Sequence, residues 1–220
     1  MIKAIIFDFD GVIVESVDIK TKAFAELFEQ ERSEVVKKVI DYHLNNTGVS
    51  RYDKFRYIYK EILKRPLRDE EFQILCDKFA DLVVSRVIDA PYVKGAIEFF
   101  KDYVPKKYKC FLVSATPQKE IKEILQKRHI AHFFSVIYGA STKKSHAVRE
   151  ILNEENIMPI DTVYVGDAMS DYLAAKDNVV NFIARINNNE SIFNDIDCIK
   201  VKDLQNLNMV IENFNVLDLK

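Results

Sequence analysis

The sequence has few cysteines, no long hydrophobic run and no excess of basic charge, and each shortage excludes a class of protein. Its three cysteines, at positions 76, 110 and 198, are odd in number and far apart. We therefore expect neither a disulfide framework nor a zinc site, and a reducing compartment fits. No segment approaches the ~20 apolar residues of a membrane span. The opening MIKAIIFDFD lacks the long apolar region of a signal peptide, so we expect a cytoplasmic protein without a membrane partner.

The overall charge is close to neutral, with a formal net charge of −2 and a pI near 6.1. This balance does not support a general nucleic-acid binder. Hydrophobic residues make up 48% of the 220 positions and charged residues 30%, which is typical of a globular protein with a sizeable core. The length fits one domain, or one domain with a modest insertion.

Short β-branched and aromatic segments alternate with helical patterns over most of the chain. Such an alternation predicts a parallel sheet that is covered by helices on both faces. The strands are expected at 2–7, 109–113, 135–138, 162–165 and 180–183, with helices at 118–127, at 145–153 and after Gly166. The segment 187–189 is expected to be a loop.

No convincing strand occurs between the first two predicted strands. Helical patterns fill this region instead, separated by breaks at 45–48 and 64–66. We therefore expect an α/β core made of residues 1–15 and 90–220, and a small all-helical insertion at 16–89. Its helices are expected at 23–30, 34–44, 54–63 and 70–87.

Polar side chains follow four of the predicted strands, at the edge where ligands bind in doubly wound sheets. The first strand runs into Asp8 and Asp10 in DFDGV, which project to the same side and repel each other. A divalent cation that arrives with a phosphoryl group would offset this repulsion. Ser114 follows the second strand, in LVSAT. Lys143 and Lys144 follow the third, and Asp167 and Asp171 follow the fourth, in GDAMSD.

Each of these residues also has a structural explanation when it is taken alone. DFD could be a solvated turn, the serine a helix N-cap, the lysines an exposed pair, and the last two aspartates a complement to a helix N-terminus. All four structural explanations would have to hold at once, with each motif at a strand end and in this order, which is improbable. This order resembles the haloacid dehalogenase superfamily of phosphatases and phosphotransferases, and the helical insertion lies where that family has its type-one cap. The resemblance implies a doubly wound, Rossmann-like α/β core with a helical cap after the first strand.

The resemblance also implies a role for each motif residue. Asp8 would be the nucleophile that forms an aspartyl phosphate, and Asp10 the general acid and base. Mg²⁺ would be held by Asp8, by the backbone carbonyl of Asp10 and by Asp167, with Asp171 as a ligand or as a support behind the ligands. A serine and a lysine would bind the phosphoryl oxygens. These are Ser114 and Lys144, with Lys143 as the alternative, and Gly11 and Ala115 are expected to contact the substrate beside them.

The insertion contains GVSRYDKFRYIYKEIL at 48–63, and its first four residues are similar to the cap loop of β-phosphoglucomutase. We expect Arg51 to contact an anionic part of the substrate, assisted by Ser50 or Lys54. The alternative is that Ser50 caps a helix with a solvated basic face. The histidines show no ligand spacing and are interpreted as surface or satisfied residues.

The predicted function is a Mg²⁺-dependent phosphatase, similar to phosphoglycolate phosphatase and β-phosphoglucomutase, that acts on a small phosphorylated metabolite. A sugar phosphate or a phosphoglycolate-like acid would fit. The alternatives are a phosphomutase, which returns the phosphoryl group to its substrate, and a non-catalytic binding protein on the same fold.

Overall fold

The computed structural model describes residues 1–186 and 190–217. Within them, one six-stranded sheet has the order β3-β2-β1-β4-β5-β6, and every neighbouring pair is parallel. The strands are β1 (Ala4–Phe7), β2 (Lys109–Val113), β3 (Phe134–Tyr138), β4 (Thr162–Gly166), β5 (Asn181–Arg185) and β6 (Ile199–Val201).

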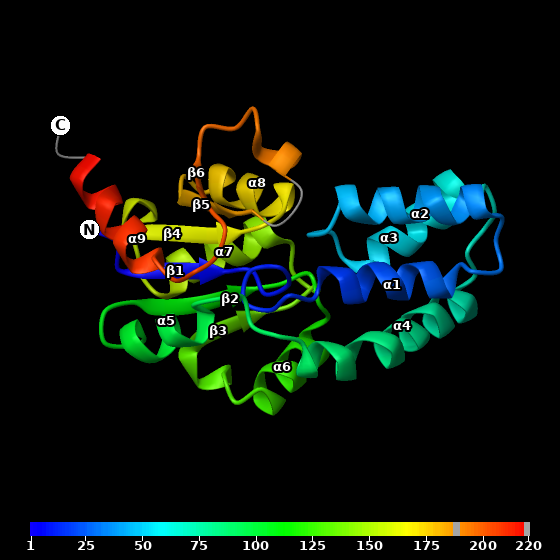
Figure 1. Cartoon of the computed structure of the whole chain (residues 1–220), viewed down its shortest axis with the longest axis horizontal. Coiled ribbons are helices and arrows are strands. Elements are labelled where there is room, and N and C mark those ends of the chain that lie inside the picture. The colour runs from blue at the N-terminus through cyan, green and yellow to red at the C-terminus, as the bar shows by residue number, and fades with distance from the viewer. Residues whose placement is uncertain (187–189, 218–220) are drawn as a thin grey trace.

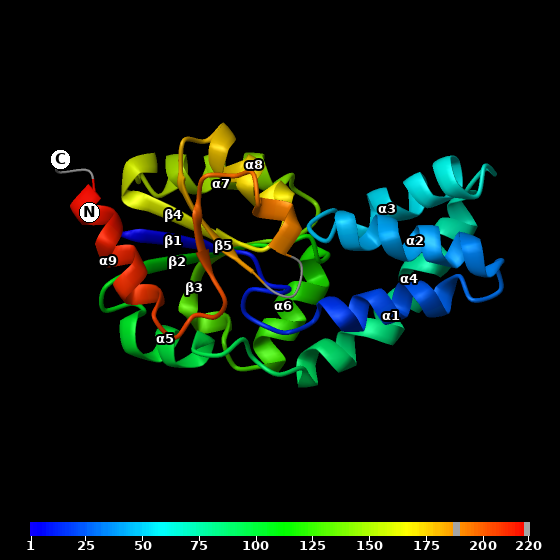
Figure 2. The ribbon, with the colours of Figure 1, turned by 45° about the horizontal axis from the view of Figure 1, so that its top comes forward.

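The strands are apolar on both sides because helices cover both faces of the sheet. In β1, Ile5 and Phe7 pack into one hydrophobic cluster, whereas Ala4 and Ile6 pack into the other. Figure 2 shows the two helical layers above and below the strands. The first layer holds α5 (Ala96–Tyr103), α6 (Gln118–Lys127) and α9 (Leu207–Leu217), and the second holds α7 (Lys144–Glu154) and α8 (Met169–Asp177).

This strand order places β1 beside β4 near the middle of the sheet, with β2 and β3 on one side and β5 and β6 on the other. The order reverses between β1 and β4, so their carboxyl ends form the crevice where doubly wound sheets bind ligands. In Figure 1 this edge faces a separate group of helices. The predicted fold, a doubly wound parallel sheet with a helical cap after the first strand, is confirmed.

The helical cap is held together by an aromatic core. Phe24 lies 5.6 Å from Phe55 and 4.8 Å from Phe79, measured between ring centroids, and all three side chains are buried. Its elements are α1 (Val17–Leu27), α2 (Ser33–Asn45), α3 (Arg51–Tyr57), a π-helical turn (Ile58–Ile62) and α4 (Asp69–Asp89).

Several element boundaries differ from the prediction. Helix α1 begins at Val17 rather than at 23, and the helix expected at 54–63 begins at Arg51 and ends in the π-helical turn. Helix α7 begins at Lys144. The elements α5, β6 and α9 were not predicted, and the expected loop at 187–189 lies outside the described residues. Short 3₁₀ turns cover Ala131–Phe133, Pro159–Asp161 and Glu190–Phe193.

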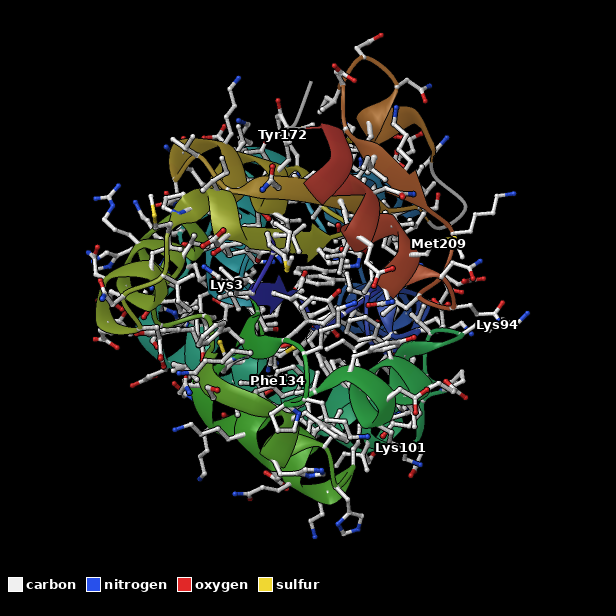
Figure 3. The ribbon with its side chains drawn as sticks, turned by 90° about the vertical axis from the view of Figure 1, so that its left-hand side faces the viewer. Lys3, Lys94, Lys101, Phe134, Tyr172 and Met209 are labelled. Carbon is white, nitrogen blue, oxygen red and sulfur yellow. The ribbon has the colours of Figure 1, made fainter. Side chains whose placement is uncertain are left out.

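The end of the sheet opposite the cap is shown in Figure 3, where Lys3 lies beside the start of β1. The Lys3 ammonium lies 2.6 Å from a carboxylate oxygen of Asp161, and the Lys3 side chain is mostly exposed. Met209 lies on α9 at the same end and is largely exposed. The predicted site residues all lie toward the other end, where the strands meet the cap.

Candidate active site

Asp8 lies directly after β1, and its side chain is only 3% exposed. The backbone N–H of Asp8 donates to the Val165 carbonyl of β4 at 3.0 Å, which continues the sheet ladder into the site. One carboxylate oxygen accepts from the N–H of Phe9 at 2.7 Å, and the other lies 2.9 Å from the Lys144 ammonium. Asp8 is therefore held rigidly at the crevice between β1 and β4.

Lys144 begins α7 and connects two aspartates. Its ammonium lies 2.7 Å from Asp171 Oδ1, which also accepts from the Tyr164 hydroxyl at 2.9 Å. The second oxygen of Asp171 accepts from the N–H of Ala168 at 3.0 Å. Both oxygens of Asp171 accept hydrogen bonds, so this side chain supports Lys144, and a role as a metal ligand stays a prediction. Of the two candidate lysines the structure brings Lys144 into the site, whereas Lys143 is exposed.

The carboxylates of Asp8, Asp167 and Asp171 can each place one oxygen within 4.8 Å of the others. Burial, followed by the neighbouring aspartate charges, raises the pKa of Asp167 well above its usual value. Burial likewise raises the pKa of Asp8 to about 7, although Lys144 opposes the shift. Among the described residues, Asp167 has no side-chain hydrogen bond or ion pair. Buried, mutually repelling carboxylate oxygens are the donor set that Mg²⁺ prefers, so these residues fit the expected metal.

Gly11 packs directly against Asp167. Its φ is +75°, in the left-handed region, and a Cβ here would lie 2.1 Å from Asp167 Oδ2. A side chain at this position would be strained and would also displace the carboxylate. Gly11 therefore shapes the site through its backbone, and a substrate contact from this residue stays a prediction.

The carboxylate of Asp10 is separate from the aspartate cluster. It accepts from Ser16 at 2.6 Å, from Thr116 at 3.0 Å and from the Lys20 ammonium at 2.5 Å. Burial alone would raise the pKa of Asp10, but Lys20 and the two hydroxyls hold it below its usual value. The motifs did not reveal Lys20 or Thr116. Residue spacing could have indicated both contacts, because Lys20 is one helical turn after Ser16 and Thr116 is two residues after Ser114.

Ser114 follows β2 and is almost fully buried. Its N–H donates to the Tyr138 carbonyl of β3 at 2.9 Å, and its hydroxyl oxygen accepts from the N–H of Thr116 at 3.1 Å. These bonds fix the hydroxyl at the same edge of the sheet as Asp8. Ala115 lies between the two residues and is partly exposed.

The predicted cap residues have three different surroundings. Ser50 is the N-cap of α3 and accepts from the N–H of Asp53 at 3.2 Å, so the helix-capping alternative is confirmed for this residue. Arg51 is buried and pairs with Glu120 of α6, while its guanidinium lies 4.6 Å from the Phe79 ring centroid. Lys54 is buried without a carboxylate partner among the described residues. Arg56 of the same helix is exposed, so the solvated basic face of the alternative does not include Arg51 or Lys54.

His43 corrects the expectation that the histidines are surface or satisfied residues. Its ring is 2% exposed and stacks on Phe24 at 4.6 Å between centroids. Nδ1 lies 2.9 Å from the Lys54 ammonium, whereas Nε2 has no partner. Burial, followed by the charge of Lys54, lowers the pKa of His43 to about 2, so the ring is neutral.

The cap and the core are in contact beside the site. The Ser170 hydroxyl donates to the Gly48 carbonyl at 3.1 Å, and a cavity of about 40 Å³ remains between the two parts. It holds about one water molecule, so a sugar phosphate requires a wider opening. The cavity is lined by Val17, Leu44, Thr47, Asp167, Arg185, Ile186, Ile192 and Phe193.

The arrangement suits transfer of a phosphoryl group. A carboxylate at the switch point of the sheet faces an ammonium, and a serine hydroxyl and a second aspartate are fixed near it. Phosphoryl transfer needs a nucleophile, a proton donor and neutralisation of charge on the transferred oxygens. Asp8, Asp10, Ser114 and Lys144 carry groups of these kinds, and their catalytic roles stay predictions.

Comparison with known proteins agrees with the fold and the motifs. The family model described as haloacid dehalogenase-like hydrolase matches residues 5–185. A phosphorylated carbohydrates phosphatase from Thermotoga maritima is 28% identical over 180 residues, which cover 79% of this chain and 80% of the relative.

Solved structures of low sequence identity share the fold. A β-phosphoglucomutase from Clostridium difficile aligns over 100% of both chains, with a TM-score of 0.78 and 20% identity. A predicted phosphoglycolate phosphatase from Haemophilus somnus aligns over 96% of this chain and 98% of its own, with a TM-score of 0.76 and 18% identity. None of the described helices is long and apolar enough to cross a membrane. From the family match over residues 5–185, the chain belongs to the haloacid dehalogenase-like hydrolase family.

Proposed function

We propose that this protein is a phosphoric monoester hydrolase, a Mg²⁺-dependent phosphatase that acts on a small phosphorylated carbohydrate or a phosphoglycolate-like acid. The observation that carries the proposal is the buried contact of 2.9 Å between Asp8 and Lys144 at the switch point of the sheet. The family match and the name of the Thermotoga maritima relative support the same chemistry. A cytoplasmic location and the absence of a nucleic-acid partner are part of the proposal.

In the first step, a carboxylate oxygen of Asp8 attacks phosphorus and the bond from phosphorus to the leaving oxygen breaks. In the complex with substrate Asp10 has to carry a proton, although Lys20 favours its ionised form in the free protein. Asp10 donates that proton to the leaving oxygen, while Ser114 and Lys144 bind the phosphoryl oxygens. Mg²⁺, held by Asp8, the Asp10 carbonyl and Asp167, would neutralise charge on the phosphoryl group. Asp171 positions Lys144 through the bond of 2.7 Å.

In the second step, water attacks phosphorus and the bond to Asp8 breaks. Asp10 takes the proton from this water, and inorganic phosphate leaves. An ionised Asp10 suits this role, and the Lys20 ammonium at 2.5 Å favours the ionised form. Hydrolysis in this step separates a phosphatase from a phosphomutase, and the hydrolase family and the phosphatase relative do not favour the mutase alternative.

We further propose that residues 16–89 act as a cap over a catalytic core of residues 1–15 and 90–220. The bond of 3.1 Å from Ser170 to Gly48 and the ion pair of Arg51 with Glu120 support a closed position of this cap. A closed cap excludes water from the reacting groups.

The test is phosphate release from a panel of phosphorylated carbohydrates and acids, with Mg²⁺ and with a chelator. Wild type is expected to release phosphate only with metal, and Asp8→Asn to lose at least about 10³-fold in rate, because the amide cannot act as nucleophile. Asp161→Asn, which changes a partly buried carboxylate at the opposite end of the sheet, is the matched control. Turnover by Asp8→Asn at the wild-type rate would refute the proposed nucleophile.

A further inference from the structure

Four cationic side chains are buried in the described part of the chain, and three of them are paired with carboxylates. The fourth, Lys54, has no carboxylate partner although its side chain is 2% exposed. A buried cation without a counter-charge is strongly unfavourable. The three pairs are Arg51 with Glu120, Lys144 with Asp8 and Asp171, and Arg185 with Glu15.

The Lys54 ammonium has hydrogen-bond partners, but no carboxylate of the described residues is in contact with it. Its ammonium lies 2.9 Å from His43 Nδ1 and 3.4 Å from the Thr47 carbonyl, and 5.5 Å from the centroid of the Phe24 ring. Burial, followed by the charge of Lys20, lowers the pKa of Lys54 well below its usual value. An anion beside the ammonium would reverse this penalty.

His43 fixes the position of this ammonium without neutralising it. The ring is buried and neutral, and Nδ1 accepts from Lys54, so the proton is on Nε2. That N–H has no partner among the described residues. The pair of His43 and Lys54 is therefore incomplete at both ends: the lysine has no anion and the histidine has no acceptor.

Lys54 is close to the catalytic residues, although it belongs to the cap. The charged groups that act on it are Lys20, Asp10, Lys144 and Asp167. Thr47, whose carbonyl accepts from Lys54, also lines the cavity between the cap and Asp167. A substrate whose phosphoryl group is bound at Asp8 would therefore extend its other end toward Lys54.

We propose that Lys54, positioned by His43, binds a second anionic group on the end of the substrate that is not transferred. This inference rests on the proposed phosphatase function and narrows its substrates to phosphomonoesters that carry a carboxylate or a second phosphate. Arg51 is already paired to Glu120, so among the buried cations that the structure describes Lys54 is the one free to receive such a group.

The test compares ester pairs that differ in the charge at this end. One pair is 3-phosphoglycerate and glycerol 3-phosphate, and the other is glucose 1,6-bisphosphate and glucose 6-phosphate. The measured quantity is the ratio of kcat/KM for the more anionic ester to kcat/KM for its partner. Because each ratio is taken within one preparation, a misfolded fraction cancels. The variants are Lys54→Met, Lys54→Arg and, as a control on the exposed side of the cap, Lys60→Met.

Wild type is expected to prefer the anionic ester in at least one pair, and that pair identifies the anion as a carboxylate or a phosphate. Lys54→Met should lower this ratio about 10- to 100-fold, since it removes a hydrogen bond between charged groups. Lys54→Arg and Lys60→Met should keep the preference. Equal rates for both members of each pair in wild type, or an unchanged ratio in Lys54→Met, would overturn the inference and leave the phosphatase intact. No turnover of any ester by wild type with Mg²⁺ would instead overturn the phosphatase, and this inference with it.

Discussion

Replacing Asp167 with asparagine is expected to stabilise the metal-free protein while it abolishes activity. The Asp167 carboxylate is buried, and burial with the neighbouring aspartates raises its pKa well above the usual 3.8. A raised folded-state pKa means that ionised Asp167 costs free energy of folding. This cost begins above the unfolded-state pKa, grows as pH rises and becomes constant above the folded-state pKa. Asparagine keeps the shape and removes the charge.

The size of the effect follows from the burial of a charge without a partner. An uncompensated buried charge costs about 3–5 kcal/mol, whereas the asparagine amide loses its hydrogen bonds to water at about 1–3 kcal/mol. The net gain is expected to be about 1–3 kcal/mol. For a chain of this length that corresponds to a rise in Tm of about 3–10 °C.

The assay is thermal unfolding in a chelator, near pH 5 and near pH 8, for wild type, Asp167→Asn and Asp161→Asn. The advantage of Asp167→Asn should be larger near pH 8, because more of the wild-type carboxylate is ionised there. Asp161 is a contrast, since Lys3 lowers its pKa and its charge favours folding. Added Mg²⁺ should raise the Tm of wild type more than that of Asp167→Asn. A lower Tm for Asp167→Asn near pH 8 would refute the reasoning.

Three further predictions concern contacts around the site. Lys144→Ala should lower kcat/KM at least about 100-fold, because it removes the ammonium 2.9 Å from Asp8. Lys143→Ala should change kcat/KM by no more than about twofold. Equal losses of kcat/KM in the two variants would contradict the assignment of Lys144 as the phosphate-binding lysine. Glu120→Gln should destabilise the fold by about 1–2 kcal/mol in urea unfolding, since buried Arg51 loses its counter-charge; an unchanged midpoint would count against this. Tyr164→Phe should lower the free energy of unfolding by about 1 kcal/mol in the same measurement, because it removes a hydroxyl that donates to Asp171 at 2.9 Å. A variant more stable than wild type would contradict this expectation.

Asp8, Ser114 and Asp167 could be predicted as candidate site residues because each directly follows a strand. A residue at the carboxyl end of a parallel strand has its position fixed by the sheet, so DFDGV and GDAMSD located Asp8 and Asp167 without further information. Residues that reach the site from helices could not be found in this way. Lys20 contacts Asp10 because α1 begins at Val17, which places Lys20 in the first turn of the helix, beside the edge of the sheet. His43 looked like a surface residue because its burial depends on α1 packing against α2.

The fold class followed from the alternation of strands and helices, but its last elements did not. Strand β6 has three residues at the edge of the sheet and is partly exposed, so its sequence carries little of the apolar signal of a buried strand. Helix α9 packs Leu207 and Ile211 onto the sheet, and these two positions are one helical turn apart. The π-helical turn after Tyr57 has no counterpart in residue spacing, which predicts only a continuous helix.

The central place of β1 has a consequence for the order of folding. Ala4 pairs in register with Lys109 on one side and with Thr162 on the other. β1 leaves the ribosome before both of these partners, so it stays unpaired until β2 is made and is enclosed on both sides only after β4 emerges. Contacts so distant in sequence slow folding and leave an apolar strand open to aggregation. During synthesis, the helical cap can fold first, because its helices are consecutive in the chain, while Ile5, Ile6 and Phe7 are still without their strand partners.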